Sequence, residues 1–446
     1  MSISTEPKYT VFSSPNTWIE GKAIEQLKQT AQWPGIEFVS GMPDLHPGRG
    51  MPIGAVWRSY PEQERMVLYP ALIGSDIGCG MSLWKLAADA ASFRSAKAAR
   101  RLAGLDDPVA TACFPEHLRS FERHPFRDSL GTIGGGNHFA EIQCVETVYD
   151  GAEALGLAPG ELCLTVHSGS RGYGGHIYRR FAEKFGYGGI AWRSADAVEY
   201  VGLHHAALTF AQTNRRVIAH RILSSLRTKG VELLDVPHNF ISFENGRLMH
   251  RKGSVSMRHP FVVIPGSRGD WTYVVSPTPA LSSPLALFSL AHGAGRKWMR
   301  SDCRGRLEKR YREADLKMTS LKSLVICEDR DLIYEEAPQA YKSVEDTVEV
   351  LETEGLCRRV ARLRAGVDIQ NDAPIKPSGK RERKMTVAVQ ISAGQGPAEC
   401  RLFAAFVHRT ILQEASDAGF DAKEDKMTRA DVGLRKLFKT LCCQAE

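Results

Sequence analysis

The 446-residue sequence lacks the patterns that mark several protein classes. Its amino-terminal segment has no charged region followed by an apolar core, so we expect no secretion signal. No apolar run reaches the length of a membrane helix, so we expect no membrane span. A Walker-type lysine loop is also absent, which argues against a P-loop nucleotide site. The cysteines have no disulfide-framework spacing, which predicts free thiols in a reducing cytoplasm; they occupy positions 79, 113, 144, 163, 303, 327, 357, 400, 442 and 443.

The composition sets broad bounds on fold and partners. Hydrophobic residues make up 43% and charged residues 24% of the chain, which is ordinary for a globular protein. The 58 basic and 51 acidic residues give a net charge of +7, an excess that suits a polyanionic partner and equally a basic enzyme without one. The length allows two or three domains, or one large domain with an appendage.

The most informative short stretch is Gly74–Gly80, in which Asp76 and Cys79 stand among three glycines. Glycines permit a tight turn that brings the carboxylate and the thiol toward one point. A thiolate can bridge two metal ions, and the carboxylate adds the hard oxygen that manganese or magnesium prefers. A structural turn with a buried cysteine is the alternative, and for this heptapeptide alone it is the stronger interpretation.

Other glycine-rich clusters carry polar residues of the same kind. Asp44 and His46 lie two apart in an extended segment. Asn137, His138 and Glu141 follow a glycine run; a strand there would place His138 and Glu141 on opposite faces and a helix would place them together, and the sequence leaves both open. A third cluster follows the predicted strand 162–166 and contains His167, Ser168, Ser170 and Arg171, which suit a phosphate.

The regular elements can be predicted from periodicity. Helical spacing predicts helices in 16–33, 92–105, 176–185 and 196–226, the last as scaffold. Strands are predicted at 81–86, at 162–166, and on both sides of the loop that contains Ser267. In the 289–300 segment, Arg296 and Arg300 would lie one and two helical turns after His292, an arrangement that suits a nucleotidylated histidine; a helix start with solvated arginines is the alternative.

Counting the candidate ligands indicates a binuclear site. Three histidines at strand ends or beside glycine, together with a thiolate and a carboxylate, could hold two divalent ions. These are His138, His167, His238, Cys79 and Asp76. His292 would then remain free to react.

In these residues the chain resembles the RtcB-type RNA ligases. The resemblance covers roughly residues 39–350 and implies an α+β RtcB-like fold with mixed and antiparallel sheets around a metal-binding cleft. By resemblance, the five ligands above bind two Mn²⁺ ions with Cys79 bridging, and His292 is the guanylylated nucleophile. The matching stretches are GMPDLHPGRGMPIGAV, SDIGCGMSL, GTIGGGNHFAEIQ, VHSGSRG, HNF, HRKG, IPGSRGDWTYV, AHGAGRKWMR and APQAYKSVE. Residues that match positions around the metals, the nucleotide or the substrate phosphates are Asp44, Asn137, Glu141, Arg171, Ser267, Thr272, Arg296, Arg300 and Tyr341.

The implied activity is GTP-dependent joining of RNA. A 2′,3′-cyclic phosphate or 3′-phosphate end would be joined to a 5′-hydroxyl end, with GTP and Mn²⁺ as cofactors and a guanylyl-histidine as intermediate. Where the family has a lysine that contacts the guanine base, this chain has Gln370, which lacks the charge. Two alternatives therefore stay open: a degenerate homologue that binds RNA ends, and a metal-dependent cyclic phosphodiesterase.

The carboxyl-terminal part departs from that family. We expect a ligase domain over 1–372, a basic linker over 373–384, and over 385–446 a short βα appendage that resembles an incomplete amino-terminal part of release factor H. A strand at 385–391, an amphipathic helix to about Ala418 and a basic helix over 428–446 are predicted. The association implies a repair role on damaged RNA, including ribosomal RNA at a stalled ribosome, with transfer-RNA splicing as the competing role.

Overall fold

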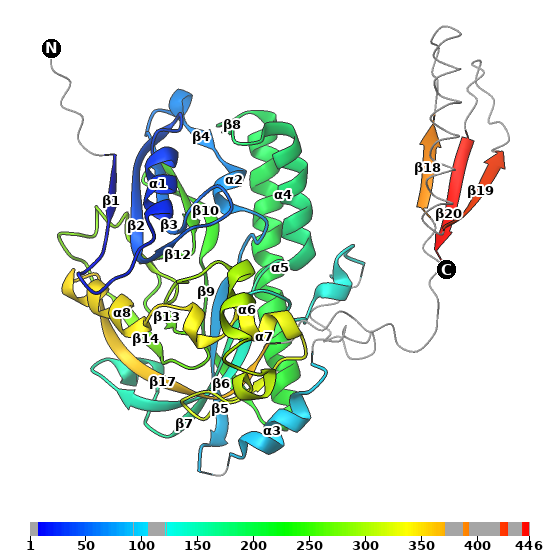
Figure 1. The fold of residues 1–446 in the computed structure, drawn as a ribbon. Helices are drawn as coiled ribbons and strands as arrows, with labels where there is room; N and C mark the ends of the chain where they lie inside the picture. The colour runs from blue at the N-terminus through cyan, green and yellow to red at the C-terminus, as the bar shows by residue number, and fades with distance from the viewer. Residues whose placement is uncertain are drawn as a thin grey trace, which may run out of the picture. The chain divides into compact units, whose positions relative to one another are not determined.

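The computed structural model divides into two compact units, Met1–Pro374 and Ile375–Glu446 (Figure 1). It describes residues 8–91, 93–105, 121, 123–370, 387–391, 420–426 and 439–445. Helices and several mostly antiparallel sheets alternate along the first unit, so the predicted α+β class is confirmed. Within the described residues, no helix combines the length and apolar character that a bilayer crossing requires.

A five-stranded sheet forms the amino-terminal part of the first unit. Its core side faces α1 (Gly21–Thr30), which contributes the fully buried Leu27. β2 is buried continuously from Val39 to His46 and β3 from Gly54 to Trp57, as expected for strands that are covered on both faces. In spatial order the strands are β1 (Tyr9–Val11), β2 (Ile36–His46), β3 (Ile53–Ser59), β11 (Arg247–Lys252) and β10 (Asn239–Glu244).

An eight-stranded sheet forms the larger layer of the same unit. β7 is buried from Leu162 to Ser168, as expected where both faces are covered, whereas β17 carries arginines that are exposed or half-buried between its buried apolar residues. β16 (Leu324–Ile326) pairs in parallel with β17, and the other neighbours are antiparallel. The remaining order is β13 (Val262–Pro265), β14 (Thr272–Pro277), β17 (Cys357–Ile369), β6 (Phe139–Val148), β7 (Glu161–Ser168), β5 (Gly80–Asp89) and β9 (Gly230–Pro237).

The helices cover the sheets. α4 and α5 lie side by side in Figure 1, and α5 packs apolar residues such as Ile218 and Ile222 into the core beside β7. Ser194 caps α5 by accepting from the amide of Ala197 at 3.2 Å. The helices are α2 (Pro70–Ile73), α3 (Ser95–Leu102), α4 (Arg171–Phe185), α5 (Ala195–Leu226), α6 (Arg300–Leu307), α7 (Arg330–Glu335) and α8 (Val344–Thr353). Two short strand pairs complete the unit: β12 (Ser254–Ser256) with β15 (Ser289–Ala291), and β4 (Val67–Leu68) with β8 (Ile190–Ala191).

Antiparallel pairing brings distant segments to one edge of the larger sheet. Gly80, at the start of β5, pairs with Ser168 at the end of β7 and with Pro237 at the end of β9. Phe139, at the start of β6, pairs with His167. The residues that precede β5 and β6 and those that end β7 and β9 therefore meet at the same edge.

The sequence predictions for the elements are mostly confirmed. The four predicted helices appear as α1, α3, α4 and α5, and the predicted strands as β5, β7, β13 and β14. In the second unit, β18 (Val387–Ile391), β20 (Lys439–Ala445) and β19 (Phe420–Lys426) form one sheet. The helix predicted over 428–446 is therefore wrong at 439–445, where pairing with two strands outweighs local helix preference. The predicted linker 373–384 and the helix preceding Ala418 lie outside the described residues.

Candidate metal centre and adjoining cavity

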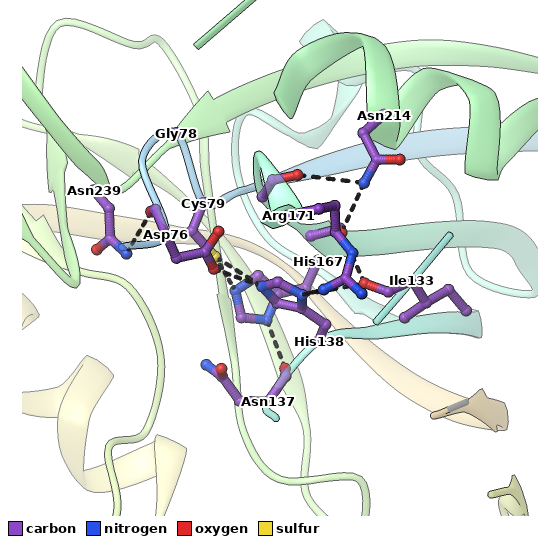
Figure 2. Close-up of polar contacts among 12 residues, drawn as sticks. Asp76, Gly78, Cys79, Ile133, Asn137, His138, His167, Arg171, Asn214 and Asn239 are labelled. Carbon is purple, nitrogen blue, oxygen red and sulfur yellow. Dashed lines mark hydrogen bonds and ion pairs between the residues drawn. The ribbon is translucent and has the colours of Figure 1, made fainter. Parts of the chain in front are cut away.

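Five side chains from four strand ends converge at the sheet edge. Cys79 lies at their centre and belongs to two groups of potential ligands, as Figure 2 shows for the first. One group is Asp76, Cys79 and His138; the other is Cys79, His167 and His238, and within each group the ligand atoms lie within 4.8 Å of one another. The structure thus brings together all five residues that the sequence predicts as metal ligands.

The distances between ligand atoms fit coordination of an ion. Cys79 Sγ lies 3.1 Å from His167 Nε2 and 3.4 Å from His138 Nε2. His167 Nε2 lies 3.3 Å from His238 Nε2. A tetrahedral ion with bonds of roughly 2.0–2.3 Å separates its ligand atoms by about 3.3–3.8 Å, so two of these separations lie in that range and the one between Cys79 and His167 is shorter. Sulfur, imidazole nitrogen and carboxylate oxygen are all donors that divalent transition metals accept, so the residues present fit such an ion.

Backbone carbonyls orient two of the imidazoles. His138 Nδ1 donates to the carbonyl of Ile133 at 3.1 Å, and His167 Nδ1 donates to the carbonyl of Asn137 at 2.8 Å (Figure 2). Nε2 of His167 then faces Cys79, and Nε2 of His138 faces both Cys79 and the Asp76 carboxylate, whose Oδ2 lies 2.8 Å away. Such outer contacts fix the tautomer of a metal-binding histidine.

The charges around the site favour neutral imidazoles. Burial, followed by the nearby imidazoles, lowers the pKa of both His167 and His238 well below the ordinary value. Burial and then the charge of Asp76 raise the pKa of the Cys79 thiol, so an ion that binds here displaces a proton. Burial alone would raise the pKa of Asp76, but contact with His138 lowers it below its usual range.

His292 lies beside this centre, immediately after β15. Its ring centroid is 4.7 Å from that of His238, and its Nδ1 lies 2.6 Å from Oδ2 of Asp44. The same carboxylate oxygen accepts from the backbone N–H of His292 at 3.3 Å. This contact places the proton on Nδ1 and leaves the Nε2 lone pair of His292 available for bond formation.

A cavity of about 830 Å³ opens from the metal centre. It is large enough for a nucleotide-sized ligand. His167 and His292 contribute to its wall, so the reactive imidazole faces the same space as the candidate metal ligands. Other predicted site residues in its lining are Asn137, Glu141, Ser267, Arg296, Arg300, Tyr341 and Gln370.

The helix predicted after His292 is wrong. β15 ends at Ala291 and α6 begins only at Arg300, so Arg296 and Arg300 do not follow His292 on one helix. Gly295 has a φ of +75°, and a Cβ there would lie 2.3 Å from the carbonyl oxygen of Asp44. Glycine favours this left-handed turn and weakens a helix, which explains the difference.

The two arginines still reach the cavity, through other partners. Arg296 Nη1 donates to Glu336 Oε1 and to the Tyr341 hydroxyl, each at 3.0 Å. Arg300 Nη2 donates to Asn137 Oδ1 at 3.2 Å and pairs with Glu336 at 3.6 Å. Burial raises the pKa of the Tyr341 hydroxyl, and Glu336 adds to the effect, so the phenol stays protonated.

Three predicted residues take less direct positions. β6 is a strand, which settles the open question for Glu141: its carboxylate accepts from Gln143 Nε2 at 2.6 Å on the face opposite His138. Gln143 Nε2 also donates to the Thr272 hydroxyl at 2.8 Å. Thr272 and Arg171 do not line the cavity; Arg171 Nη1 lies 3.4 Å from His138 Nδ1, behind the metal ligands.

Sequence reasoning missed four buried residues around the site. Asn214 accepts from the amide of Gly131 at 2.6 Å and donates to Ser168 Oγ at 3.0 Å, which joins two glycine loops. Arg215 donates to the carbonyl of Gly78 at 2.8 Å. Both lie in α5, where apolar periodicity hides them. Arg268 and Asp368 line the cavity, and the available signal for Asp368 was a single acidic residue in a strand whose other charged residues are arginines.

Comparison with known proteins agrees with this geometry. The family described as tRNA-splicing ligase RtcB matches residues 26–113 and 108–371. RNA-splicing ligase RtcB2 of Escherichia coli is 46% identical over 367 residues, covering 80% of this chain and 94% of that protein. The tRNA-splicing ligase RtcB of Aeropyrum pernix is 29% identical, covering 77% and 90%. The RNA-splicing ligase RtcB of Mycobacterium tuberculosis is 28% identical, covering 76% and 98%. A match over most of the first unit, which includes every converging side chain, means that the chain belongs to the RtcB family of RNA-splicing ligases.

Proposed function

We propose that this chain is a GTP- and manganese-dependent RNA ligase. It would join an RNA end that carries a 2′,3′-cyclic phosphate or 3′-phosphate to one that carries a 5′-hydroxyl. The observation that supports this most strongly is His292, whose Nδ1 is bonded to Asp44 while its ring adjoins the two ligand groups that share Cys79. An imidazole held in this orientation, with its Nε2 directed away from Asp44, is suited to attack on phosphorus.

Each residue has a part in this reaction. Asp76, Cys79, His138, His167 and His238 would hold two Mn²⁺ ions, which when bound supply charge neutralisation at the α-phosphate. The lone pair of His292 Nε2 forms a bond to the α-phosphorus of GTP, and pyrophosphate leaves. Asp44 keeps the Nδ1 proton in place as positive charge develops on the ring.

The second half of the reaction consumes the guanylylated histidine. Where the RNA end is a 2′,3′-cyclic phosphate, water first attacks its phosphorus, the bond to the 2′-oxygen breaks, and a 2′-hydroxyl and a 3′-phosphate result. A 3′-phosphate oxygen then attacks the phosphorus held by His292, the bond to His292 breaks, and the RNA end carries GMP. The 5′-hydroxyl of the other RNA then attacks the 3′-phosphate, GMP leaves, and a phosphodiester remains. Arg296 and Arg300, which reach the cavity wall, would neutralise the phosphates during these steps.

The biological setting is also part of the proposal. We propose RNA repair, with ribosomal RNA at the ribosome as one substrate and tRNA as the other candidate, in the cytoplasm, where the described cysteines would remain reduced. The domain assignment is part of the proposal: a ligase over 1–372, a linker over 373–384 and a release-factor-H-like fragment over 385–446.

A joining assay tests the proposal. Purified protein is incubated with Mn²⁺ and an RNA pair carrying 2′,3′-cyclic phosphate and 5′-hydroxyl ends, with and without GTP; a pair with 3′-hydroxyl and 5′-phosphate ends is the control. Joining of the first pair alone, and only with GTP, is expected. Opening of the cyclic phosphate without GTP and without joining would identify a phosphodiesterase instead. RNA binding without joining, restored by Gln370→Lys, would identify the degenerate homologue.

A further inference from the structure

A buried lysine lies behind the nucleophile, outside the cavity. Lys342 stands between the short helical turn Pro338–Ala340 and α8, and it is only 6% exposed. Among the described residues, its ammonium group pairs with backbone carbonyls and with no carboxylate. Burial lowers the pKa of Lys342 to about 8, although the charge of Asp44 opposes the shift, so the side chain remains largely protonated at neutral pH. A buried charge without a paired countercharge destabilises a fold, which points to a role beyond packing.

The side chain of Lys342 holds the backbone on both sides of Asp44. Nζ donates to the carbonyl of Pro43 at 3.2 Å and to that of Leu45 at 2.8 Å. The pairing of β2 with β3 shifts register within residues 41–46, so the residues between these two ends have no facing partners on β3. Buried carbonyls require a donor, and Lys342 supplies one to each of these two.

The main chain of the same residue is bonded to the segment that follows His292. The amide of Lys342 donates to the carbonyl of Gly295 at 3.0 Å. Lys342 therefore contacts the Asp44 segment through its side chain and the His292 segment through its backbone. It connects the two segments whose separation decides whether Oδ2 of Asp44 reaches Nδ1 of His292.

We propose that Lys342 is a positioning residue for the nucleophile, which holds the carboxylate of Asp44 at hydrogen-bonding distance from the ring of His292. That distance is 2.6 Å from Oδ2 to Nδ1. Lys342 itself does not line the cavity, so it acts through Asp44 and not on the nucleotide. The inference rests on the proposed transfer of GMP to His292 and assigns that step a residue outside the nucleotide cavity.

A double-mutant cycle tests whether Lys342 acts through Asp44. The rate of protein labelling by α-labelled GTP with Mn²⁺ is measured in the full chain, in Lys342→Met, in Asp44→Asn and in the double variant. Methionine fills the buried space but cannot donate. We expect Lys342→Met to slow labelling roughly 10–100-fold at saturating GTP, because a small displacement of Asp44 misplaces the nucleophile. In the Asp44→Asn background, the same substitution should slow labelling less than about threefold, because the contact that it supports is already lost.

Two further measurements separate positioning from a general loss of structure. The GTP concentration at half-maximal rate and the amount of bound Mn²⁺ should each change less than about threefold in Lys342→Met. Neither the cavity lining nor the two ligand groups include Lys342. Lys309→Met, which replaces an exposed lysine just after α6, is the control and should label at the rate of the parent.

Three outcomes would overturn the inference: an unchanged rate in Lys342→Met, a rate loss matched by an equal loss of bound Mn²⁺, or a loss in the double variant equal to the product of the two single losses. The last would mean that Lys342 acts independently of Asp44. If Lys342→Met does not fold, Lys342→Gln, which keeps an N–H donor on a shorter neutral chain, takes its place in the cycle. Absence of labelling in the parent would instead overturn the proposed function.

Discussion

The contact between Asp44 and His292 positions the proposed nucleophile beside the metal centre. Asp44 is fully buried in β2, and its Oδ2 accepts from both the ring and the backbone of His292. Only one tautomer of the imidazole satisfies that contact, and it is the tautomer with Nε2 free. The carboxylate is therefore a positioning group for the nucleophile as well as a countercharge.

Replacing this carboxylate by an amide should slow guanylylation. In Asp44→Asn, the amide oxygen or the NH₂ group can face Nδ1, so the wrong tautomer of His292 becomes accessible. We expect the single-turnover rate of protein labelling to fall roughly 10²–10⁴-fold with metal content unchanged. Asp302→Asn, an exposed change on α6, is the control. An unchanged rate in Asp44→Asn would contradict the positioning role.

The pH dependence of stability offers a test for Asp368. Its folded-state pKa of about 7 lies above the ordinary value of 3.8, so the folded protein holds this proton more tightly. The contribution of Asp368 to the free energy of unfolding is fully present below pH 3.8 and is lost as the pH rises through about 7. The charged groups facing it are Arg268, Glu141 and Glu336.

Asp368→Asn should remove this pH-dependent loss of stability. Without nucleotide, we expect the variant to gain roughly 1–4 kcal/mol of unfolding free energy relative to the parent between about pH 4 and about pH 8. Urea unfolding at several pH values measures the difference. Parallel pH profiles for the two proteins would show that Asp368 is not the group responsible, and Glu146→Gln should give such parallel profiles.

The residues of the site could be predicted from the sequence to very different degrees. Cys79, His138 and His292 stand in glycine-rich motifs, where the residue type and its neighbours indicate chemistry directly. Arg268 also stands in such a motif, but neither it nor Asp368 could be assigned to the cavity from the sequence, because β17 reaches the site only when it pairs with β6. Whether a charge inside a strand faces solvent or a cavity depends on that pairing.

Helix α5 supports the metal centre from behind. Arg215 forms a buried pair with Asp235 and donates to the carbonyls of Gly78 and Ser168, each at 2.8 Å. Gly78 belongs to the loop that carries Asp76, and Ser168 follows His167 at the end of β7. Arg215 thus holds two ligand-bearing segments in place at once.

Replacing Arg215 should lower the free energy of unfolding. Arg215→Met leaves Asp235 buried without its countercharge, so we expect the free energy of unfolding to fall by roughly 3–5 kcal/mol. The amount of bound Mn²⁺ should fall as well, because both ligand-bearing segments lose a hydrogen bond from Arg215. Arg216→Met is the matched control on the same helix: its pair with Glu232 is partly exposed, so its loss should be about 0–1 kcal/mol. Equal effects of the two substitutions would exclude a bracing role.

The helices and strands could be predicted from the sequence more reliably than the segments that connect them. Periodicity predicts α5 and β7 because burial of one face controls residue type over many positions. In the stretch from His292 to Arg300, the histidine and the arginines have the spacing of a helix. Its backbone nevertheless forms hydrogen bonds with a distant segment: the amide of Ala294 donates to the carbonyl of Pro265 at 3.0 Å. Such long-range bonds leave no periodic trace in the sequence.

Across the whole first unit, the metal centre joins strands that are far apart in the chain. The loop before β5 supplies Asp76 and Cys79, while His138, His167 and His238 come from β6, β7 and β9 or their ends. An ion bound to the folded state alone therefore stabilises the assembled sheet. At a free Mn²⁺ concentration of 100 times its Kd, the stabilisation is about 2.7 kcal/mol.

Removal of metal should then lower the melting temperature. We expect chelation to reduce it by several degrees in the parent protein and to have little effect in Cys79→Ser, which lacks the bridging ligand. Cys144→Ser, which changes a half-buried cysteine outside both ligand groups, should respond as the parent does. A chelator effect that persists in Cys79→Ser would mean that the ion binds elsewhere.

Transfer of GMP to His292 is the central claim, and labelling tests it most directly. The full chain is incubated with Mn²⁺ and GTP labelled at its α-phosphate, beside His292→Ala. The structure predicts one acid-labile, alkali-stable label per chain at His292 and none in the variant, with metal content equal in the two. Absence of label in the parent, or undiminished label in His292→Ala, would contradict the account.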